Sequence, residues 1–131
     1  MNSFNHYAYG AIGEWMYANL MGLKINENYP GFKRFTIKPL FDKNFVNIDG
    51  SFKSSYGKIA VAWSRKNGKL QLTIEIPANT SSDVILNKPS DGSWKLENPK
   101  LISKILSNVE NMHKTLFLLG SGKYNFSFVA N

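Results

Sequence analysis

The sequence predicts a mainly β protein, an antiparallel β-sandwich that is preceded by one N-terminal amphipathic α-helix. Several short segments alternate apolar with polar residues, and turn residues separate them at intervals of about eight to twelve positions, as in β-sandwiches. The chain also contains nine Phe, six Tyr and three Trp, residue types that favour strands. With 131 residues and a hydrophobic content of 43%, it can bury the core of one compact domain.

The helix is expected over Ala8–Met21, where apolar residues recur at the spacing of one helical face. Asn5 or Ser3 would supply the N-cap, and Gly22 would end the helix in a left-handed conformation. The apolar face of this helix finds little partner surface in a chain that is otherwise β. We therefore expect the helix to lie across the sandwich or to pair with a second copy in a homodimer.

The chain is expected to divide into three segments. Residues 1–24 form the helix, residues 25–34 form a linker, and residues 35–131 form the sandwich. Within the linker, Tyr29–Phe32 has Pro and Gly at the two central positions of a type II turn.

Two short strands are expected at the start of the sandwich. Phe35 and Ile37 lie on one face of the first, with polar residues between and after them. The second covers Phe45–Lys53 and contains a bulge or a turn at Asp49-Gly50.

The segment Gly57–Pro77 gives the clearest strand signal. Its Asn67-Gly68 dipeptide is the preferred two-residue loop of a type I′ hairpin. Counting back from this loop pairs Lys66 with Lys69, Trp63 with Leu72, Val61 with Ile74, and Ile59 with Ile76. A slip of one residue would move the apolar pairs to the other face, so the register is well specified.

Further strands are expected in the C-terminal half. One covers Ser82–Asn87, and another begins at Trp94. Leu101–Val109 has helical spacing but is assigned to strand and loop because its surroundings are β. Thr115–Leu119 and Lys123–Val129 are expected to pair as a closing hairpin around a Gly-Ser-Gly turn.

The charge balance does not indicate a nucleic-acid partner. The formal net charge is +7 and the pI is about 9.6, but the lysines are scattered and only Arg34 and Arg65 can make bidentate contacts with phosphates. No cysteine is present, and His6 and His113 lack carboxylates at metal-ligand spacing, so no metal site is expected. The sequence shows neither a signal peptide nor a membrane span, and the expected location is cytoplasmic as encoded.

Few residues qualify as catalysts. His6 beside the helix is read as a capping or packing residue, with catalysis as the alternative. Glu14 could act as a general acid, but a surface charge on the helix is the favoured interpretation. Asp42, Asp49 and Asp83 fall in turns or at strand ends without an acidic partner, whereas glycoside hydrolysis generally needs two opposed carboxylates.

Loop aromatics offer a different function. Tyr29, Phe32, Tyr56 and Trp94 are the candidates for exposed rings on which sugars could stack. Packing within the sheets is the ordinary role of such residues. If they gathered at one end of the sandwich, the chain would be a small carbohydrate-binding or structural interaction module.

The N-terminal segment carries a resemblance to a known family. Ser3–Tyr17, with its Asn-His-Tyr block and the following Gly-x-x-Gly-Glu-Trp, closely resembles a segment of bacterial α-L-rhamnosidases of glycoside hydrolase family 78. The similarity continues in order through Ala18–Gly22, Pro30–Lys33, Ile37–Pro39, Ser55–Ile59, Trp63, Ile76–Thr80 and Gly120–Tyr124.

This resemblance implies the last helix of a six-hairpin α/α toroid followed by the C-terminal β-sandwich of an inverting glycosidase. It places His6 at the rhamnose subsite, while Asn5 and Tyr7 shape the loop around it. The catalytic carboxylates of the family lie upstream of the matched part, and Glu14 aligns with neither. The resemblance therefore implies no catalytic residue, metal or cofactor in this chain, inactivity alone, and two partners, a rhamnose-containing carbohydrate and the missing toroid.

Overall fold

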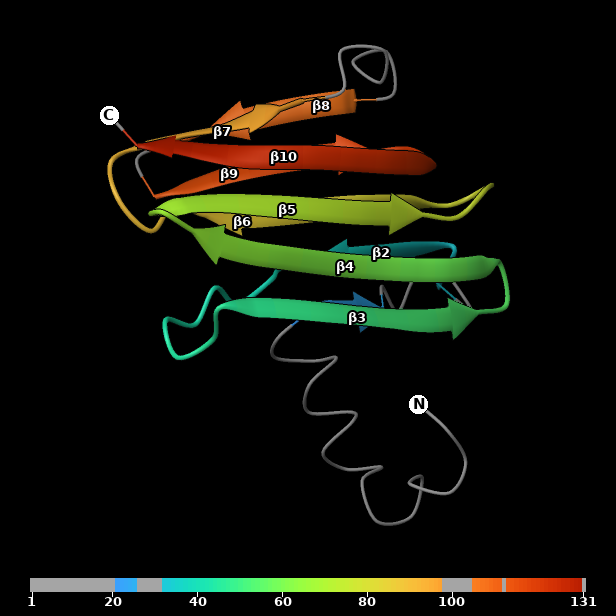
Figure 1. Ribbon diagram of the computed structural model, residues 1–131. Helices are drawn as coiled ribbons and strands as arrows, with labels where there is room; N and C mark the ends of the chain where they lie inside the picture. The colour runs from blue at the N-terminus through green and yellow to red at the C-terminus, as the bar shows by residue number, and fades with distance from the viewer. Residues whose placement is uncertain (1–20, 26–31, 98–104, 112, 131) are drawn as a thin grey trace, which may run out of the picture.

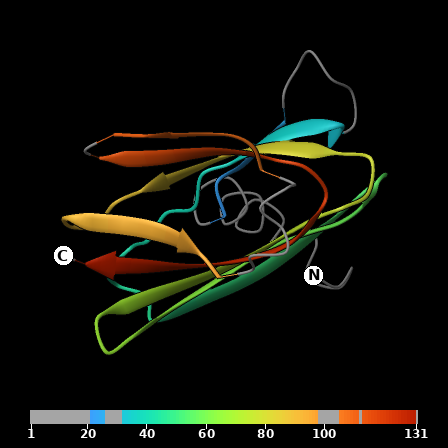
Figure 2. The same ribbon diagram turned by 90° about the horizontal axis from the view of Figure 1, so that it is seen from above.

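Two five-stranded sheets pack face to face in the computed structural model, which describes residues 21–25, 32–97, 105–111 and 113–130. Figure 1 shows one sheet in front of the other, and Figure 2 shows the same sheets from above as two separate layers. The predicted β-sandwich is therefore confirmed. The predicted helix falls almost entirely on residues 1–20, which lie outside the described part of the chain.

The sheets are named here A and B. Sheet A contains, in spatial order, β1 (Leu23–Ile25), β2 (Arg34–Ile37), β6 (Ser81–Asn87), β9 (Lys114–Leu119) and β8 (Ile105–Glu110). Sheet B contains β3 (Asn47–Ser54), β4 (Gly57–Lys66), β5 (Lys69–Ile76), β10 (Gly122–Ala130) and β7 (Gly92–Leu96). Neighbouring strands are antiparallel except for β2 and β6, which are parallel.

The core lies between the two sheets because each strand points every second side chain inward. Phe35 and Ile37 of β2 are fully buried, as their alternation predicts. Aromatic rings join the layers: the ring centroids of Phe117 in sheet A and Phe126 in sheet B are 5.0 Å apart. Within the described residues, no helix is long and apolar enough to cross a bilayer.

The hairpin of β4 and β5 has the predicted register. Lys66 pairs with Lys69, Trp63 with Leu72, and Val61 with Ile74. Asn67 and Gly68 have φ angles of 54° and 76°, as a type I′ loop requires at both positions. The regular ladder ends at Ala60 and Glu75, so the outermost predicted pair, Ile59 with Ile76, lies beyond it, although both side chains are buried.

The bulge or turn predicted at Asp49-Gly50 is wrong. Strand β3 pairs with β4 without a register shift, and Gly50 lies directly opposite Val61. The glycine serves packing, because a Cβ atom at this position would lie 2.7 Å from Sδ of Met21.

The predicted closing hairpin is also wrong. Strand β9 pairs with β6 and β8 in sheet A, whereas β10 pairs with β5 and β7 in sheet B. The Gly-Ser-Gly segment therefore crosses from one sheet to the other, and the Tyr124 hydroxyl donates a hydrogen bond to the Gly120 carbonyl across this connection at 2.9 Å. Both strands turn apolar side chains toward the same core, so their alternation looks the same as that of paired strands.

The sandwich begins before the predicted boundary at residue 35. Leu23 and Ile25 belong to strand β1, which pairs with β2, and Met21 and Leu23 are buried in the core. The main chain enters sheet A at Gly22, whose carbonyl accepts a hydrogen bond from the Lys38 amide at 3.0 Å. The C-terminal strands agree better with expectation: β7 contains Trp94, and Ile105–Glu110 is a strand.

Burial raises the pKa of the Tyr124 hydroxyl from 10.0 to about 12. Between these values the folded protein keeps a proton that the unfolded chain releases, so rising pH favours unfolding. We expect Tyr124→Phe to lower the free energy of unfolding by about 1 kcal/mol at pH 8, through the lost hydrogen bond. Because the variant lacks the titrating hydroxyl, its deficit should shrink as the pH rises above 10.

Urea unfolding of both proteins between pH 8 and pH 11.5 measures this difference, and the other tyrosines and the lysines cancel in the comparison. Two stability curves that stay parallel over the whole range would show that Tyr124 does not have the raised pKa.

Candidate functional site

The predicted sugar-contacting residues cannot be placed. Asn5, His6, Tyr7 and Glu14 lie outside the residues that the structure describes, so their roles remain predictions. His113 is exposed between β8 and β9, where its main-chain amide donates a 2.9 Å hydrogen bond to the Asn111 side chain.

The candidate carboxylates do not converge. Asp42 lies in the loop before β3 and accepts a 2.8 Å hydrogen bond from the Asn44 amide. Asp49 is on the outer face of sheet B, and Asp83 is on the outer face of sheet A, 3.2 Å from Arg34. In the described ranges, His, Asp and Glu side chains nowhere form a group of three that could hold a metal.

Tyr29 lies outside the described residues, and the three aromatic candidates that the structure describes do not form a common platform. Phe32 is half-buried against Phe52, with 4.8 Å between the ring centroids. Trp94 is 7% exposed, and its indole N–H donates to the Asn87 carbonyl at 3.2 Å. Tyr56 is exposed in the turn between β3 and β4.

The register shows how far apart two of these aromatics lie. Trp94 is opposite Phe128, which is itself opposite Leu70 beside the β4–β5 turn. Tyr56 occupies the β3–β4 turn at the other end of the same sheet. The described aromatics therefore give no support to a sugar-stacking site.

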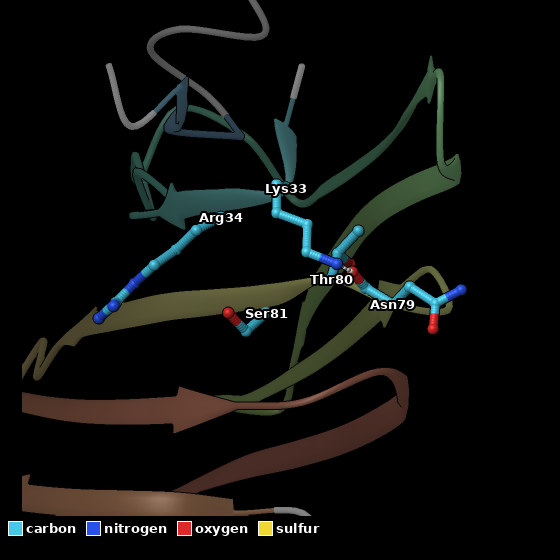
Figure 3. Close-up of a pocket in the computed structure, with 5 residues that line it drawn as sticks. All are labelled: Lys33, Arg34, Asn79, Thr80 and Ser81. Atoms are coloured by element: carbon cyan, nitrogen blue, oxygen red, sulfur yellow. Dashed lines mark hydrogen bonds between the residues drawn. The ribbon is translucent and has the colours of Figure 1, made fainter. Parts of the chain in front are cut away.

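A hollow of about 390 Å³ lies where the parallel strands β2 and β6 begin. It is lined by Lys33, Arg34, Asn79, Thr80 and Ser81 (Figure 3). Figure 3 shows the Lys33 side chain directed toward Asn79 and Arg34 directed away from it. Lys33 Nζ donates to the Asn79 carbonyl at 2.6 Å and lies 5.5 Å from the centre of the Tyr56 ring.

The local backbone explains this arrangement. Asn79 has a φ of 64°, which Asn tolerates better than most residues. The Thr80 hydroxyl closes the turn by donating to the Pro77 carbonyl at 2.7 Å. The Ser81 amide then donates to the Lys33 carbonyl at 3.2 Å, where the parallel pairing starts.

This hollow is best explained by a structural role, as the place where separate segments of the chain pack together. Lys33 is engaged by a carbonyl and a ring, and Arg34 forms an ion pair with Asp83. The stretches around Lys33, Gly57 and Pro77, each of which resembles the family, come together at this hollow. Lys33 binds the Asn79 carbonyl, and the ideal Cβ position of Gly57 lies 3.0 Å from the Pro77 Cβ. Each of these stretches can be recognised in the sequence, but the contact between them is apparent only in the structure.

The outer face of sheet A carries an exposed apolar band. Ile85, Leu116 and Val109 lie in one row across β6, β9 and β8, and Leu118 is two residues further along β9. Leu116 is 36% exposed and Val109 is 59% exposed. The sequence signal for this face is the uninterrupted apolar run Leu116–Leu119, which is typical of a strand covered on both sides.

Comparison with known proteins gives a consistent result. Residues 22–100 match the family model described as bacterial α-L-rhamnosidase C-terminal domain. The chain is 33% identical over 128 residues to an α-L-rhamnosidase of Formosa agariphila, which covers 96% of this chain and 14% of that protein. It is 39% identical over 84 residues to one of Streptomyces avermitilis, covering 64% of this chain and 8% of that protein.

Solved structures show the same similarity. The Streptomyces avermitilis α-L-rhamnosidase, solved in complex with L-rhamnose, superposes with a TM-score of 0.67 at 29% identity, covering 97% of this chain and 12% of that one. The Aspergillus terreus α-L-rhamnosidase superposes with a TM-score of 0.64 at 25% identity, covering 95% and 12%. The chain thus spans only 8% to 14% of the length of these proteins.

Proposed function

The chain belongs to the bacterial α-L-rhamnosidase family, in which it corresponds to the C-terminal domain, and from this premise we propose that it serves as the non-catalytic sandwich domain of a glycoside hydrolase. The observation that carries the proposal is the family match over residues 22–100, which spans strands β1 to β7 of both sheets. The substrate of the complete enzyme would be a rhamnose-containing carbohydrate, in keeping with the L-rhamnose bound by the Streptomyces avermitilis relative.

The placement of the acidic residues supports the absence of catalysis in this chain alone. Inverting glycosidases need two carboxyl groups about 6.5–9.5 Å apart on opposite sides of the scissile bond. Asp49 and Asp83 face opposite sides of the sandwich, and Asp42 lies in a loop. The catalytic pair would therefore come from the part of the enzyme that the relatives carry in addition to this domain.

The apolar band of sheet A supplies the surface on which that remaining part would dock. In the Formosa relative the matching domain is one part of a protein about seven times its length, because the match covers only 14% of that protein. An exposed apolar patch on such a domain is normally covered by a partner surface. A contact through residues 1–24, with the toroid or with a second copy, is an additional proposal.

Docking is tested by mixing the chain with the Formosa relative from which the matching C-terminal segment has been deleted. We expect a one-to-one complex in analytical ultracentrifugation. The double variant Val109→Lys/Leu116→Lys should weaken the complex at least about tenfold, since it places two charges in an apolar contact.

The matched control is Asn47→Lys/Ser93→Lys, which adds the same charge at exposed positions of sheet B. It should leave the complex unchanged. Equal weakening by both double variants, or no complex with the native chain, would contradict docking through sheet A.

A further inference from the structure

The outer face of sheet B contains a polar trough along strand β4. The outward residues of β4 include the short side chains Ala60, Ala62 and Ser64, whereas longer polar side chains stand on the neighbouring strands β3 and β5. A hollow of about 230 Å³ results. Its outward-pointing lining residues are Asn47, Asp49, Ala62, Ser64, Gln71 and Thr73.

Lysines surround this trough. Six exposed lysines point outward from the strands of sheet B, namely Lys53, Lys58, Lys66, Lys69, Lys95 and Lys123. At the outward positions of these strands the carboxylates are Asp49 and Glu75, and Lys123 lies directly opposite Glu75. The face therefore carries an excess of positive charge at both ends of the trough.

Four of the lysines form two directly opposed pairs. Lys53 is the cross-strand partner of Lys58, and Lys66 is the cross-strand partner of Lys69. Like charges at opposed positions of a sheet destabilise it. Lysine on an edge strand can prevent association of sheets, but only Lys53 lies on an edge strand, so that explanation does not cover the other three.

The two pairs are placed to hold an extended ligand. Lys58 and Lys66 are eight residues apart on the same strand, which corresponds to about 26 Å at the rise of an extended chain. Between the pairs the outward side chains are mostly amides and hydroxyls, together with the two carboxylates Asp49 and Glu75. Such groups suit the hydroxyls of a sugar, and the lysines suit anionic substituents as point charges.

We propose that the outer face of sheet B binds a polyanionic saccharide chain lengthwise over the trough, with its sulfate or carboxylate groups at the two lysine pairs. The choice of a saccharide rests in part on the proposed function, whereas the affinity for a polyanion follows from the lysine arrangement alone. A nucleic acid fits less well, because the outward positions of the described strands of sheet B hold no arginine and no aromatic side chain for stacking bases.

Binding of the full chain to four probes tests the proposal by fluorescence titration. The probes are dextran sulfate, polygalacturonate, neutral dextran and a single-stranded oligonucleotide. We expect binding to a sulfated or a carboxylated polymer that weakens with added salt, and no binding to neutral dextran. The two anionic polymers distinguish sulfate from carboxylate recognition.

The variant Lys53→Gln/Lys58→Gln/Lys66→Gln/Lys69→Gln should bind the preferred polymer at least about tenfold more weakly. It should also unfold at the same or a higher temperature, because the opposed charges are removed. The control Lys24→Gln/Lys38→Gln/Lys43→Gln/Lys114→Gln removes the same charge from exposed positions elsewhere and should retain the native affinity.

An equal loss in both variants would show that net charge alone is responsible and would overturn the proposal. So would tighter binding of the oligonucleotide than of either saccharide, or binding of none of the probes. The measurement involves no hydrolysis, so its failure would leave the proposed place of the chain in a rhamnosidase untouched.

Discussion

Gly22→Val is expected to lower the free energy of unfolding by about 4 kcal/mol or to prevent folding. Gly22 has a φ of 66°, and a Cβ atom there would lie 1.7 Å from the Lys38 carbonyl oxygen. The variant would combine an unfavourable backbone conformation with a clash against main-chain atoms. The chain could relieve this clash only by separating residue 22 from the segment after β2, which would break the 3.0 Å hydrogen bond between them.

Urea unfolding measures this loss, and Gly68→Ala is the control. Gly68 has a similar φ of 76°, but no atom lies within 4 Å of its ideal Cβ position. The control should therefore show the backbone cost alone, about 1–2 kcal/mol. Equal losses in the two variants would show that the close approach at Gly22 does not contribute to stability.

Trp63→Ala should cost about 3–5 kcal/mol, because it removes the largest side chain of β4 from the core. Trp63 is 2% exposed, faces Leu72 across the hairpin, and meets the Phe41 ring at a centroid distance of 5.4 Å. The cavity left by alanine would be bordered by strands that are fixed by their hydrogen bonds and could close only in part.

Trp63→Phe separates the loss of packing from the loss of the indole. The indole N–H of Trp63 is buried without a hydrogen-bond partner, so its removal recovers a desolvation cost. We expect phenylalanine to lose less than half as much stability as alanine in the same urea titration. A loss below about 1 kcal/mol for alanine would mean that Trp63 is not a central core residue.

Local patterns predicted the parts of the fold that local physics determines. The Asn67-Gly68 loop fixes the register of β4 and β5 because a two-residue loop leaves one pairing that keeps the apolar residues on one face. The pairing of β9 with β10 was predicted wrongly because alternation records only which side chains face a core. A partner beside a strand and a partner across the core produce the same alternation.

Glycines illustrate a second limit. The sequence predicts a bulge or a turn at Asp49-Gly50, because glycine inside a strand often marks a bulge. The actual reason for Gly50 is the approach of Met21 from a segment far away in the sequence. Such long-range packing leaves no local pattern, and the same applies to the contact between Lys33 and Asn79.

The lysine pairs on the outer face of sheet B could be predicted only in part. The opposition of Lys66 and Lys69 follows from the predicted hairpin, but that of Lys53 and Lys58 requires the pairing of β3 with β4, which was not predicted. Family resemblance pointed to His6, which lies outside the described residues. The apolar run Leu116–Leu119 gives a local signal for the apolar outer face of sheet A, whereas the lysine-rich outer face of sheet B depends on the arrangement of the strands.

The most direct test of the proposed non-catalytic role is an assay of the purified chain on an aryl α-L-rhamnoside, with the complete Formosa agariphila relative as the positive control. Because the catalytic carboxylates are proposed to lie outside this domain, we expect no release of the aryl group above the buffer rate at a protein concentration well above that of the control enzyme. Turnover that follows the native chain through purification and is abolished by Glu14→Gln would contradict this role, because the chain would then contain a catalytic carboxylate of its own.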